Sequence, residues 1–456
     1  METDRERREG DGLFRTAVES GDAAVISRAA GDLRAPEILE HWHDWPPEAR
    51  ALIVTSLAPE PAAELISNLP PEEQAELLEA QPTKRAREVL EAFDPDDLAD
   101  VLQFLDATAP EHAGRIRALL APSTRELVEK LASYEEDVAG GLMTPEFVSL
   151  QGSMTVAEAL TYLREASPDA ETIYYLYVVD PGQRLLGVLS LRELIIASPD
   201  TCVEDLMGRD VLHVRTGTDQ EKVAQIMADY DLSVLPVVDQ ADRLVGIVTI
   251  DDVLDVVEVE ATEDIHRLGG APVDLDYARA RPWTLFRKRA PWLVLLVVSM
   301  TLTFNVISHF EDVLAEVVIL AAFIPLLIGT GGNVGAQVAT MVVRSLGTRN
   351  LEPRDYFRVF AKEVGTGLML GLAFGVFMTA YVLLFQSEPS VAVALGITMV
   401  LISLVANLVG ASLPFLFHRL GIDPALTSSP GITTVMDVVG LLIYFHVVIW
   451  VLGLGA

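Results

Sequence analysis

The sequence predicts a multidomain protein with an all-α helical solenoid, a tandem pair of α/β modules, a connecting helix and an α-helical membrane domain of five transmembrane helices. Three observations predict this architecture. Prolines recur every 11 to 15 residues between Pro47 and Pro122, one segment occurs twice between residues 143 and 255, and five long apolar stretches follow residue 281. These features are typical of stacked short helices, of a duplicated small domain and of a membrane domain, respectively.

The helical domain is expected over residues 35–140, after an N-terminal arm over residues 1–34 that is a candidate for disorder. Several of its prolines stand in phrases such as "LPPEE" and "FDPDD". Proline is tolerated in the first turn of a helix, and acidic residues there interact favourably with the helix dipole. The prolines therefore predict the starts of short helices that stack as an acidic α-solenoid. They are Pro47, Pro59, Pro71, Pro82, Pro95, Pro110 and Pro122.

The duplicated segment predicts two similar α/β modules, over residues 141–200 and 201–255. "LMTPEFVSL" at 142–150 returns as "LMGRDVLHV" at 206–214, and "LYVVDPGQRLLGVLSLREL" at 176–194 returns as "LPVVDQADRLVGIVTIDDV" at 235–253. In each copy an apolar strand, a polar turn and a second strand precede an amphipathic helix.

The charge is distributed unevenly along the chain. Residues 1–280 contain 57 acidic and 23 basic groups, whereas residues 281–456 contain 9 and 10. A soluble region with such an excess of acid excludes nucleic acid as a partner, because binding to phosphates needs a basic surface. It suits a cation binder, although a merely solubilising acidic surface is an equally common explanation. The single cysteine, Cys202, is compatible with a reducing compartment.

The five apolar stretches cover approximately residues 290–308, 313–343, 364–385, 391–417 and 425–453. Basic residues precede the first stretch and occur between the second and third and between the fourth and fifth, but not in the other two connections. By the positive-inside rule, this pattern places the acidic soluble region in the cytoplasm and the C-terminus outside. The N-terminus "METDRERREG" is charged and lacks an apolar core, so we expect no secretory signal peptide. We therefore expect a multi-pass protein of the plasma (cytoplasmic) membrane. In a cell with two membranes, this is the inner membrane.

Two of the stretches carry unusual residues for a membrane helix. In the second, Pro325 and the glycines of "GTGGNVGAQ" at 329–337 favour local unwinding, which would free carbonyls to bind a cation. Asn333 and Gln337 lie four residues apart and project from one face. Close glycine-mediated helix packing is the alternative explanation. In the fifth, Asp437 is an acid among apolar residues, which costs at least ~2.5 kcal/mol in a bilayer and indicates a functional site.

The connecting helix, expected over residues 256–280, continues an acidic stretch that begins at the end of the second module. Mutually repelling carboxylates can gather around Mg²⁺ or Ca²⁺ and draw domains together, as in a metal-operated latch. A solvated acidic helix is the alternative. The acids are Asp251, Asp252, Asp255, Glu258, Glu260, Glu263 and Asp264.

The duplicated module resembles the cystathionine-β-synthase (CBS) domain, which packs in tandem and often binds adenine nucleotides. Thr249 and Asp252 in "TIDD" match the nucleotide-binding pattern of that family, whereas the first copy departs from it with Glu193 in "SLRE". The resemblance therefore implies a nucleotide site at the second copy, with ATP as a candidate ligand.

Over almost its whole length, the chain resembles the MgtE family of magnesium transporters. Three phrases carry the match: "SYEEDVAGGLMTP" at 133–145, "GTGGNVGAQ" at 329–337 and "DPALTSSPGITTVMDVVGLLIY" at 423–444. The resemblance implies a homodimer in the lipid membrane, with a pore (residues 281–456) along the dimer axis. It also implies that cytoplasmic Mg²⁺ binds between the helical domain, the CBS pair and the connecting "plug" helix, and closes the pore.

The resemblance assigns residues to two kinds of Mg²⁺ site. Pore positions are matched by Asp437, Asn333 and Gln337. The cytoplasmic regulatory candidates are Asp252, Asp255, Glu260, Glu263 and Asp264 of the plug region, Glu221 and Asp231 of the second CBS domain, Glu64, Asp96 and Asp100 of the helical domain, and Asp423 at the mouth of the fifth span. Asp252 is a candidate for either nucleotide or metal. Val334 and Ala336 stand where more polar residues are expected.

The expected function is Mg²⁺-selective influx driven by the membrane potential, closed by cytoplasmic Mg²⁺ and modulated by ATP. No phosphate-binding loop or other phosphoryl-transfer motif occurs, so we expect no enzymatic activity. Two alternatives belong to other classes. A CBS-regulated anion channel would need basic groups in the spans, and a receptor for a nucleotide signal would need no intramembrane carboxylate.

Overall fold

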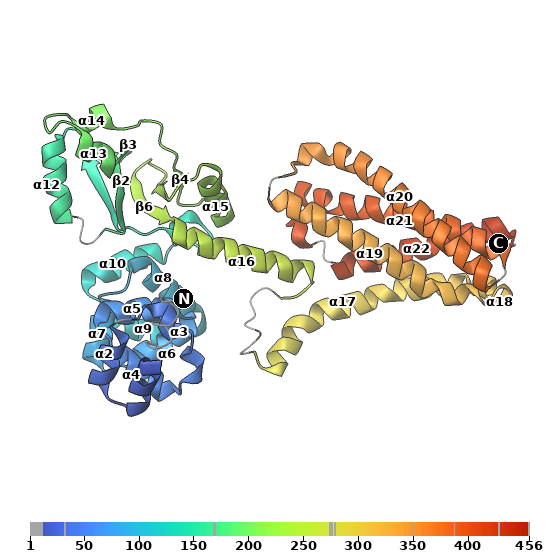
Figure 1. Ribbon diagram of the computed structural model, residues 1–456, viewed down its shortest axis with the longest axis horizontal. Helices are drawn as coiled ribbons and strands as arrows, with labels where there is room; N and C mark the ends of the chain where they lie inside the picture. The colour runs from blue at the N-terminus through green and yellow to red at the C-terminus, as the bar shows by residue number, and fades with distance from the viewer. Residues whose placement is uncertain are drawn as a thin grey trace. The chain divides into compact units, whose positions relative to one another are not determined.

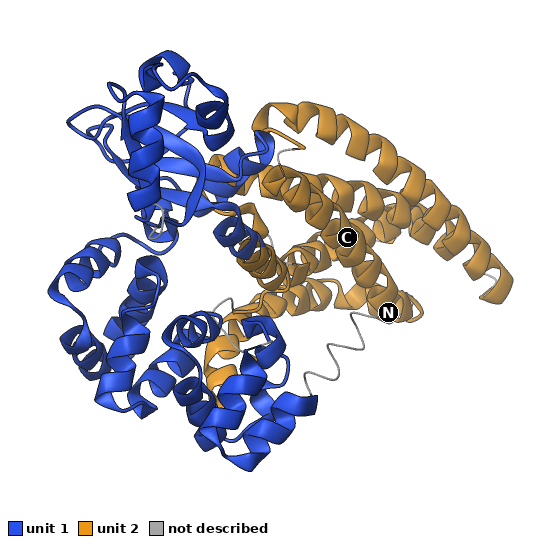
Figure 2. Ribbon diagram, turned by 60° about the vertical axis from the view of Figure 1, so that its left-hand side comes forward, with its two compact units in different colours: residues 1–257 blue, residues 258–456 orange. Residues whose placement is uncertain are grey.

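The computed structural model describes residues 12–31, 33–166, 170–272, 277, 280–348, 350–386, 388–426 and 429–454. The chain forms two compact units, an N-terminal unit of residues 1–257 and a C-terminal unit of residues 258–456 (Figure 2). The boundary falls inside helix α16 (Ile250–Leu268). Each unit has its own hydrophobic core.

Short helices build the first part of the N-terminal unit, as the recurring prolines predict (Figure 1). Six of the seven prolines occupy the first position of a helix, and Pro82 immediately precedes one. The helices are α2 (Ala23–Ala30), α3 (Ala35–Leu39), α4 (Pro47–Ser56), α5 (Pro59–Ser67), α6 (Pro71–Ala80), α7 (Thr83–Leu90), α8 (Pro95–Thr108), α9 (Pro110–Leu119) and α10 (Pro122–Leu131), with a 3₁₀ turn at Trp42–Asp44.

The segment expected to be an N-terminal arm contributes to this domain from residue 12 onward. Residues 12–20 are helical and α2 follows directly. Phe14, Val18 and Ile26 are buried in the same core as Trp42. The prediction of disorder over residues 1–34 is therefore wrong for residues 12–31, because this apolar stripe was not recognised in the sequence. Residues 1–11 and 32 lie outside the described part of the chain.

The duplicated segment forms two sheets of identical topology, which confirms the predicted modules. In each sheet the central strand pairs parallel with the first strand and antiparallel with the third. The first module contains α11 (Ala139–Leu142), β1 (Phe147–Gln151), α12 (Val156–Ala166), β2 (Thr172–Val179), β3 (Leu185–Ser190) and α13 (Leu191–Ile196). The second contains α14 (Val203–Leu206), β4 (Val214–Arg215), α15 (Gln220–Asp229), β5 (Val234–Val238), β6 (Leu244–Thr249) and the start of α16.

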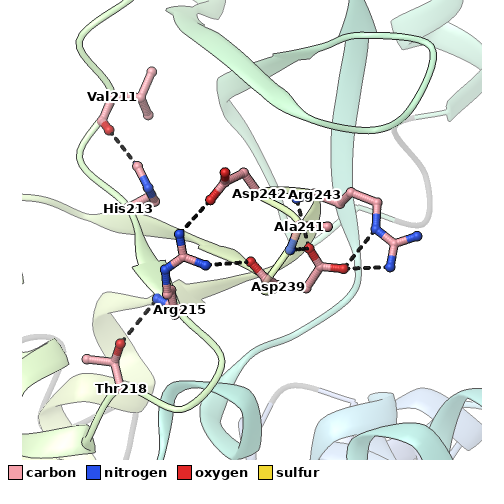
Figure 3. Close-up of polar contacts among 8 residues, drawn as sticks. All are labelled: Val211, His213, Arg215, Thr218, Asp239, Ala241, Asp242 and Arg243. Carbon is pink, nitrogen blue, oxygen red and sulfur yellow. Dashed lines mark hydrogen bonds and ion pairs between the residues drawn. The ribbon is translucent and has the colours of Figure 1, made fainter.

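The polar turn between β5 and β6 is held by side chains, as Figure 3 shows. Asp239 accepts hydrogen bonds from the backbone N–H groups of Ala241 (2.8 Å) and Arg243 (3.0 Å), and from Arg243 Nε (2.8 Å). Arg215 donates to Asp242 Oδ1 (2.7 Å) and to the carbonyl of Asp239 (3.2 Å). Asp242 has φ of 60°, and the short polar residue is suited to this left-handed position. The turn therefore fixes the register of the hairpin that leads into α16.

The C-terminal unit contains five helices that are long and apolar enough to cross a membrane, among the described residues. They are α17 (Pro282–His309), α19 (Leu320–Gly347), α20 (Tyr356–Phe385, after the 3₁₀ turn Pro353–Asp355), α21 (Pro389–Arg419) and α22 (Ser429–Leu452). A short helix α18 (Glu311–Glu316) and the 3₁₀ turn Pro424–Leu426 lie in the connections. Figure 1 shows α19, α20, α21 and α22 running side by side.

The second span is an unbroken helix, so the predicted local unwinding at Pro325 and the glycines does not occur. The glycines instead allow close packing, which was the alternative explanation. A Cβ at Gly332 would lie 2.7 Å from Thr433 of α22, and one at Gly410 of α21 would lie 2.4 Å from the carbonyl oxygen of Gly335. Small residues at such contacts let helix backbones approach closely.

Candidate cation sites

Acidic side chains gather at the N-terminal end of α8, where the phrase "FDPDD" starts the helix. Asp96 is half-buried, and burial together with the carboxylate of Asp97 raises its pKa to about 8. Asp100 is exposed at its surface, but partial loss of solvation, followed by the carboxylates of Asp97, Glu136 and Asp252, raises its pKa to about 7. Asp96 Oδ1 is buried and has no hydrogen-bond partner among the described residues. Negative charge is therefore concentrated at this end of α8.

The start of α16 adds its own carboxylates to this group. Burial raises the pKa of Asp252, while a hydrogen bond from Thr249 Oγ1 at 2.6 Å opposes the increase. Asp252 contributes to the raised pKa of Asp96, Asp97 and Asp100, and Asp255 contributes to that of Asp97. The predicted metal ligands Asp96, Asp100, Asp252 and Asp255 thus lie in one electrostatic cluster, which we call the α8–α16 acid cluster.

Glu64 borders this cluster from α5. It lines a cavity of about 430 Å³ together with Glu60, Asp94 and Asp97. Asp97 accepts a hydrogen bond from Ser67, and its pKa rises to about 6 through burial and the neighbouring carboxylate of Asp94. The cavity is therefore an acidic recess that continues the α8–α16 acid cluster into the helical domain.

Glu221 and Asp231 belong to the second CBS module, at the two ends of α15. Glu221 is exposed in the first turn of α15, and Asp231 is exposed just after this helix with φ of 52°. Neither residue is among the carboxylates that raise the pKa values of Asp96 or Asp100. Their assignment as metal ligands remains a prediction.

The end of α16 belongs to the C-terminal unit, where its acidic side chains interact with arginines. Arg267 forms ion pairs with Glu263 and with Asp423 in the connection before α22. Burial and the carboxylate of Glu260 raise the pKa of Asp264, and Arg344 at the end of α19 opposes this effect. The three carboxylates Glu263, Asp264 and Asp423 therefore have positive partners.

Asp437 lies in the middle of α22 and is only 7% exposed. Met436, its neighbour, packs against Gly331 and Gly335 of α19. Two turns further along, Tyr444 donates a hydrogen bond of 3.0 Å to the carbonyl of Leu320, which anchors α22 to the start of α19. The acid is thus buried within the C-terminal unit rather than exposed on an outer face.

Asn333 and Gln337 are exposed in the single chain, on the side of α19 that does not pack against α21 and α22. Thr340 and Arg344 are exposed further along the same helix. Polar side chains in a membrane helix are expected to face protein or a water-filled cavity. This polar side of α19 is left uncovered by the described residues of the chain.

A separate cavity of about 800 Å³ lies between the two CBS modules. It is lined by Thr249, Asp251, Arg192 and Glu171, together with Tyr174, Tyr175 and apolar side chains. Burial and neighbouring carboxylates, first that of Asp94, raise the pKa of Glu171 to about 7. Of the two predicted nucleotide residues, Thr249 lines this cavity and Asp252 belongs to the α8–α16 acid cluster. The cavity has the volume and the mixed lining of a small-molecule site.

The donor set of the α8–α16 acid cluster suits a hard divalent cation. Among the residues that the structure describes, no three His, Cys, Asp or Glu side chains stand close enough to enclose a metal ion. Mg²⁺ does not need such a cage, because it keeps several waters and binds through one or two carboxylates. Carboxyls with raised pKa values would lose their protons to solvent when such an ion binds.

Several acids of the site were missed by sequence reasoning. Asp94 and Asp97 lie in the same phrase as Asp96, and Glu60 lies one turn from Glu64. The signal that could have found Asp94 and Asp97 is the run of three acids around Pro95. Glu171 carries no such signal, because only the folding of the first module brings it near Asp252.

Family profiles match most of the chain. The MgtE intracellular N domain matches residues 33–137, the CBS domain matches residues 137–200 and 203–259, and the divalent cation transporter domain of MgtE matches residues 324–447. The fold, the acid cluster and the five apolar helices thus define a multidomain, multi-pass membrane transporter for divalent cations.

Comparisons with individual proteins narrow this class. The chain is 51% identical to the magnesium transporter MgtE of Thermus thermophilus, over 94% of this chain and 96% of that protein. It is 40% identical to the magnesium transporter MgtE of Enterococcus faecalis, over 70% of each. The chain belongs to the MgtE family of magnesium transporters, which are not enzymes.

Solved structures support the architecture of the N-terminal unit. The cytosolic domain of the Mg²⁺ channel MgtE, solved in complex with ATP, is 52% identical, covers 54% of this chain and 99% of its own, and has a TM-score of 0.53. The soluble part of a magnesium transporter is 31% identical, covers 56% and 99%, and has a TM-score of 0.52.

Proposed function

We propose that this transporter is a Mg²⁺ influx channel that is closed by cytoplasmic Mg²⁺ bound in the α8–α16 acid cluster. The observation that carries the proposal is the set of raised pKa values at Asp96, Asp97, Asp100 and Asp252, whose carboxylates perturb one another, together with the buried Asp96 Oδ1 that has no hydrogen-bond partner among the described residues. Without a metal, these carboxyls repel one another when ionised. A Mg²⁺ ion between α8 and α16 would remove that repulsion and hold the helical domain against the second CBS module.

The link from this cluster to the membrane domain is α16 itself. Its first turns carry Asp252 and Asp255, and its last turns carry Glu260, Glu263 and Asp264. A rigid helix that is fixed at one end by Mg²⁺ would fix the other end at the mouth of α22, near Asp423. Closure would then result from holding α16, and loss of Mg²⁺ would release it.

In the pore, Asp437 would bind the permeating ion. Two such carboxylates, one from each copy of a homodimer, would balance a hydrated Mg²⁺ without binding it too tightly to leave. The exposed polar side of α19 with Asn333 and Gln337 supports a second copy, because these side chains would otherwise contact lipid. The N-terminal unit would lie in the cytoplasm of a cell whose plasma membrane holds the spans, with the C-terminus outside.

The cavity between the CBS modules would bind an adenine nucleotide. Tyr174 and Tyr175 could stack on a base, and Arg192 is a cationic group for phosphate. The complex of a related cytosolic domain with ATP supports this ligand. Glu171 and Asp251 line the same cavity, so a nucleotide would enter more readily with Mg²⁺ than as a free anion.

Limited proteolysis tests the latch. Millimolar Mg²⁺ is expected to protect the N-terminal unit of the full-length protein, cutting the rate of cleavage between the helical domain and the CBS pair at least several-fold. Asp100→Asn and Asp252→Asn should reduce this protection, whereas Asp106→Asn, on the same helix but outside the cluster, should not. If Mg²⁺ gave no protection and only a nucleotide did, the latch proposal would be wrong.

A further inference from the structure

The first span, α17, packs against the rest of the C-terminal unit along one stripe. None of its 28 residues, all of which the structure describes, is buried, whereas each of the other four spans has buried residues. A Cβ at Gly270, just after α16, would lie 2.4 Å from Trp292 Nε1, so Trp292 faces the protein. A series of half-buried residues at helical spacing extends this side along the helix. They are Leu285, Trp292, Leu296, Ser299, Thr303, Val306 and Ile307.

The far side of α17, away from this stripe, carries an aromatic pair and a basic residue at its start. A rotation of about 100° per residue places Trp283, Phe286 and Arg287 roughly 120–180° around the axis from Trp292. Trp283 is 70% exposed and Phe286 is 59% exposed, and their rings stack with centroids 5.3 Å apart. Arg287 is exposed one turn after Trp283. An aromatic surface with an adjacent guanidinium therefore faces away from the protein.

Arg287 differs in position from the other basic residues at the start of this helix. Arg281, Lys288 and Arg289 lie within about 60° of Trp292 around the axis, on the side toward the protein. Of these four residues, only Arg287 lies on the far side. It can therefore contact lipid directly, whereas the other three add to the positive potential around it.

The length of α17 sets the depth of these residues in a bilayer. Its 28 residues extend about 42 Å, whereas the hydrocarbon core is about 30 Å thick. The excess of about 12 Å corresponds to roughly eight residues, which is the length of the basic segment 282–289. The remaining segment, residues 290–309, contains no Asp, Glu, Lys or Arg. Trp283 and Arg287 therefore lie at the level of the lipid headgroups.

Pro291 supports this depth. A proline has no N–H group, so the carbonyl of Arg287, four residues earlier, lacks its usual helical donor. An unpaired carbonyl is costly in hydrocarbon, whereas water is available to it among the headgroups. The start of α17 is therefore suited to the membrane–water interface.

The chemistry of the far side fits an anionic headgroup. No Asp or Glu occurs between Tyr277 and Phe310, and Arg287 takes part in no ion pair among the described residues. A guanidinium binds a phosphate through two parallel hydrogen bonds, and Trp is enriched where its ring can lie among headgroups. A second copy that docked through this same surface would bring like charges together. Lipid phosphate is therefore the better partner.

We propose that Trp283 and Arg287 bind the headgroup of an anionic phospholipid in the leaflet that surrounds the start of α17. The bound lipid would anchor the helix against which the end of α16 packs at Gly270. The proposed topology is used only to identify this leaflet as the cytoplasmic one.

The test is thermal unfolding of the full-length protein in a neutral detergent at fixed Mg²⁺. The protein is titrated with dioleoyl phosphatidylglycerol or with dioleoyl phosphatidylcholine, which differ in headgroup charge but not in their chains. A ligand that binds only the folded state raises Tm in a saturable manner. Phosphatidylglycerol is expected to raise Tm on the order of 2–4 °C more than phosphatidylcholine does. An increase in NaCl from about 50 mM to about 500 mM should remove most of this difference, because salt screens exposed charges.

Substitutions locate the response. Arg287→Gln should shift the midpoint of the phosphatidylglycerol titration to about fivefold higher concentration, which corresponds to about 1 kcal/mol for one basic residue at an anionic surface. Trp283→Leu should also raise the midpoint. The matched control is Arg289→Gln, at nearly the same depth but toward the protein, and it should shift the midpoint less than about twofold. Asp437→Asn should keep the response whatever its effect on Mg²⁺ influx, so this proposal and the channel proposal fail independently.

Three results would overturn the proposal. Equal rises in Tm with the two lipids would show that the protein does not select the headgroup charge. Equal shifts in Arg287→Gln and Arg289→Gln would indicate diffuse attraction rather than a site on the far side of α17. If Arg287→Gln instead changed the oligomeric state in detergent and left the lipid response intact, a second copy would cover this surface.

Discussion

Replacing Asp96 by Asn should stabilise the metal-free protein and weaken its response to Mg²⁺. Burial and the carboxylate of Asp97 raise the pKa of Asp96 from 3.8 to about 8. Asn has nearly the same shape and removes the charge that the site disfavours. The same substitution removes a predicted ligand of the regulatory ion. The two effects have opposite signs, which makes the variant informative.

The pKa increase sets the pH window. Between about pH 4 and pH 8, the folded protein keeps a proton on Asp96 that the unfolded chain has lost, so stability falls as pH rises through this window. Each pKa unit corresponds to about 1.4 kcal/mol, so above pH 8 the ionised carboxylate of Asp96 would cost about 5 kcal/mol of folding free energy. Local relaxation and water entry reduce it, and we expect Asp96→Asn to gain about 1–3 kcal/mol at pH 8.

The assay is chemical unfolding of residues 1–257 with and without Mg²⁺, from pH 5 to pH 8.5. This unit is compact, and the solved soluble parts of two relatives cover 54% and 56% of this chain. Asp106→Asn is the matched control on α8, because a hydrogen bond from Arg117 lowers the pKa of Asp106. That control should lose a little stability at neutral pH and keep its full response to Mg²⁺.

Two outcomes would refute this reasoning. If Asp96→Asn were destabilising at pH 8 without Mg²⁺, the carboxylate would have a positive or hydrogen-bonding partner in solution. Equal stabilisation of the variant and the unmodified fragment by Mg²⁺ would show that Asp96 is not part of the ion site.

Three further predictions concern other parts of the chain. Arg267→Gln removes the positive partner of two predicted Mg²⁺ ligands, Glu263 and Asp423. In flux assays, Mg²⁺ should therefore close the channel at a roughly two- to fivefold lower concentration. The control Arg354→Gln, which breaks a surface ion pair, should leave this concentration unchanged. Gly410→Ala places a Cβ 2.4 Å from a backbone carbonyl oxygen of α19 and should lower the free energy of unfolding by about 1–3 kcal/mol, which a lower Tm would show. The control Gly365→Ala meets no atom within 4 Å and should leave Tm unchanged. Arg192→Gln should weaken ATP binding about tenfold in calorimetry, and an unchanged affinity would remove the nucleotide from the CBS cavity.

Local signals in the sequence predicted the architecture of the soluble region well. Proline at the first helical position depends on the residue itself, and this is why Pro59, Pro71 and Pro95 all start helices. The duplicated strands were equally readable, since each copy repeats the same alternation. The helix at residues 12–20 was missed because its short apolar stripe gains stability only from burial against Trp42 and its neighbours.

The membrane domain was harder to predict in detail. Pro325 and three nearby glycines are compatible both with a broken helix and with tight packing, and only the neighbouring Thr433 and Gly410 decide between them. The outlier Asp437 could be found from its apolar surroundings in the sequence. The buried acid Glu363 of α20 could not, because it follows Lys362 near a helix end and its burial depends on α21.

The α8–α16 acid cluster shows the same limit. Spacing along one helix placed Asp96 and Asp100 on a common face, and composition marked α16 as acidic. Their convergence with Asp252 depends on the packing of the helical domain against the second CBS module, which no local pattern encodes. The family resemblance predicted that the helical domain and the plug region share Mg²⁺ sites. The structure adds that the carboxylate of Asp252 raises the pKa values of Asp96 and Asp100.

The central claim is that Asp437 binds the Mg²⁺ ion that crosses the membrane. The most direct measurement is Mg²⁺ influx into proteoliposomes that contain full-length protein, with the unmodified chain compared with Asp437→Asn at equal reconstitution. We expect the substitution to reduce influx at least tenfold while the protein remains folded and its soluble unit is still protected by Mg²⁺ from proteolysis. Influx at the unmodified rate in Asp437→Asn would contradict it.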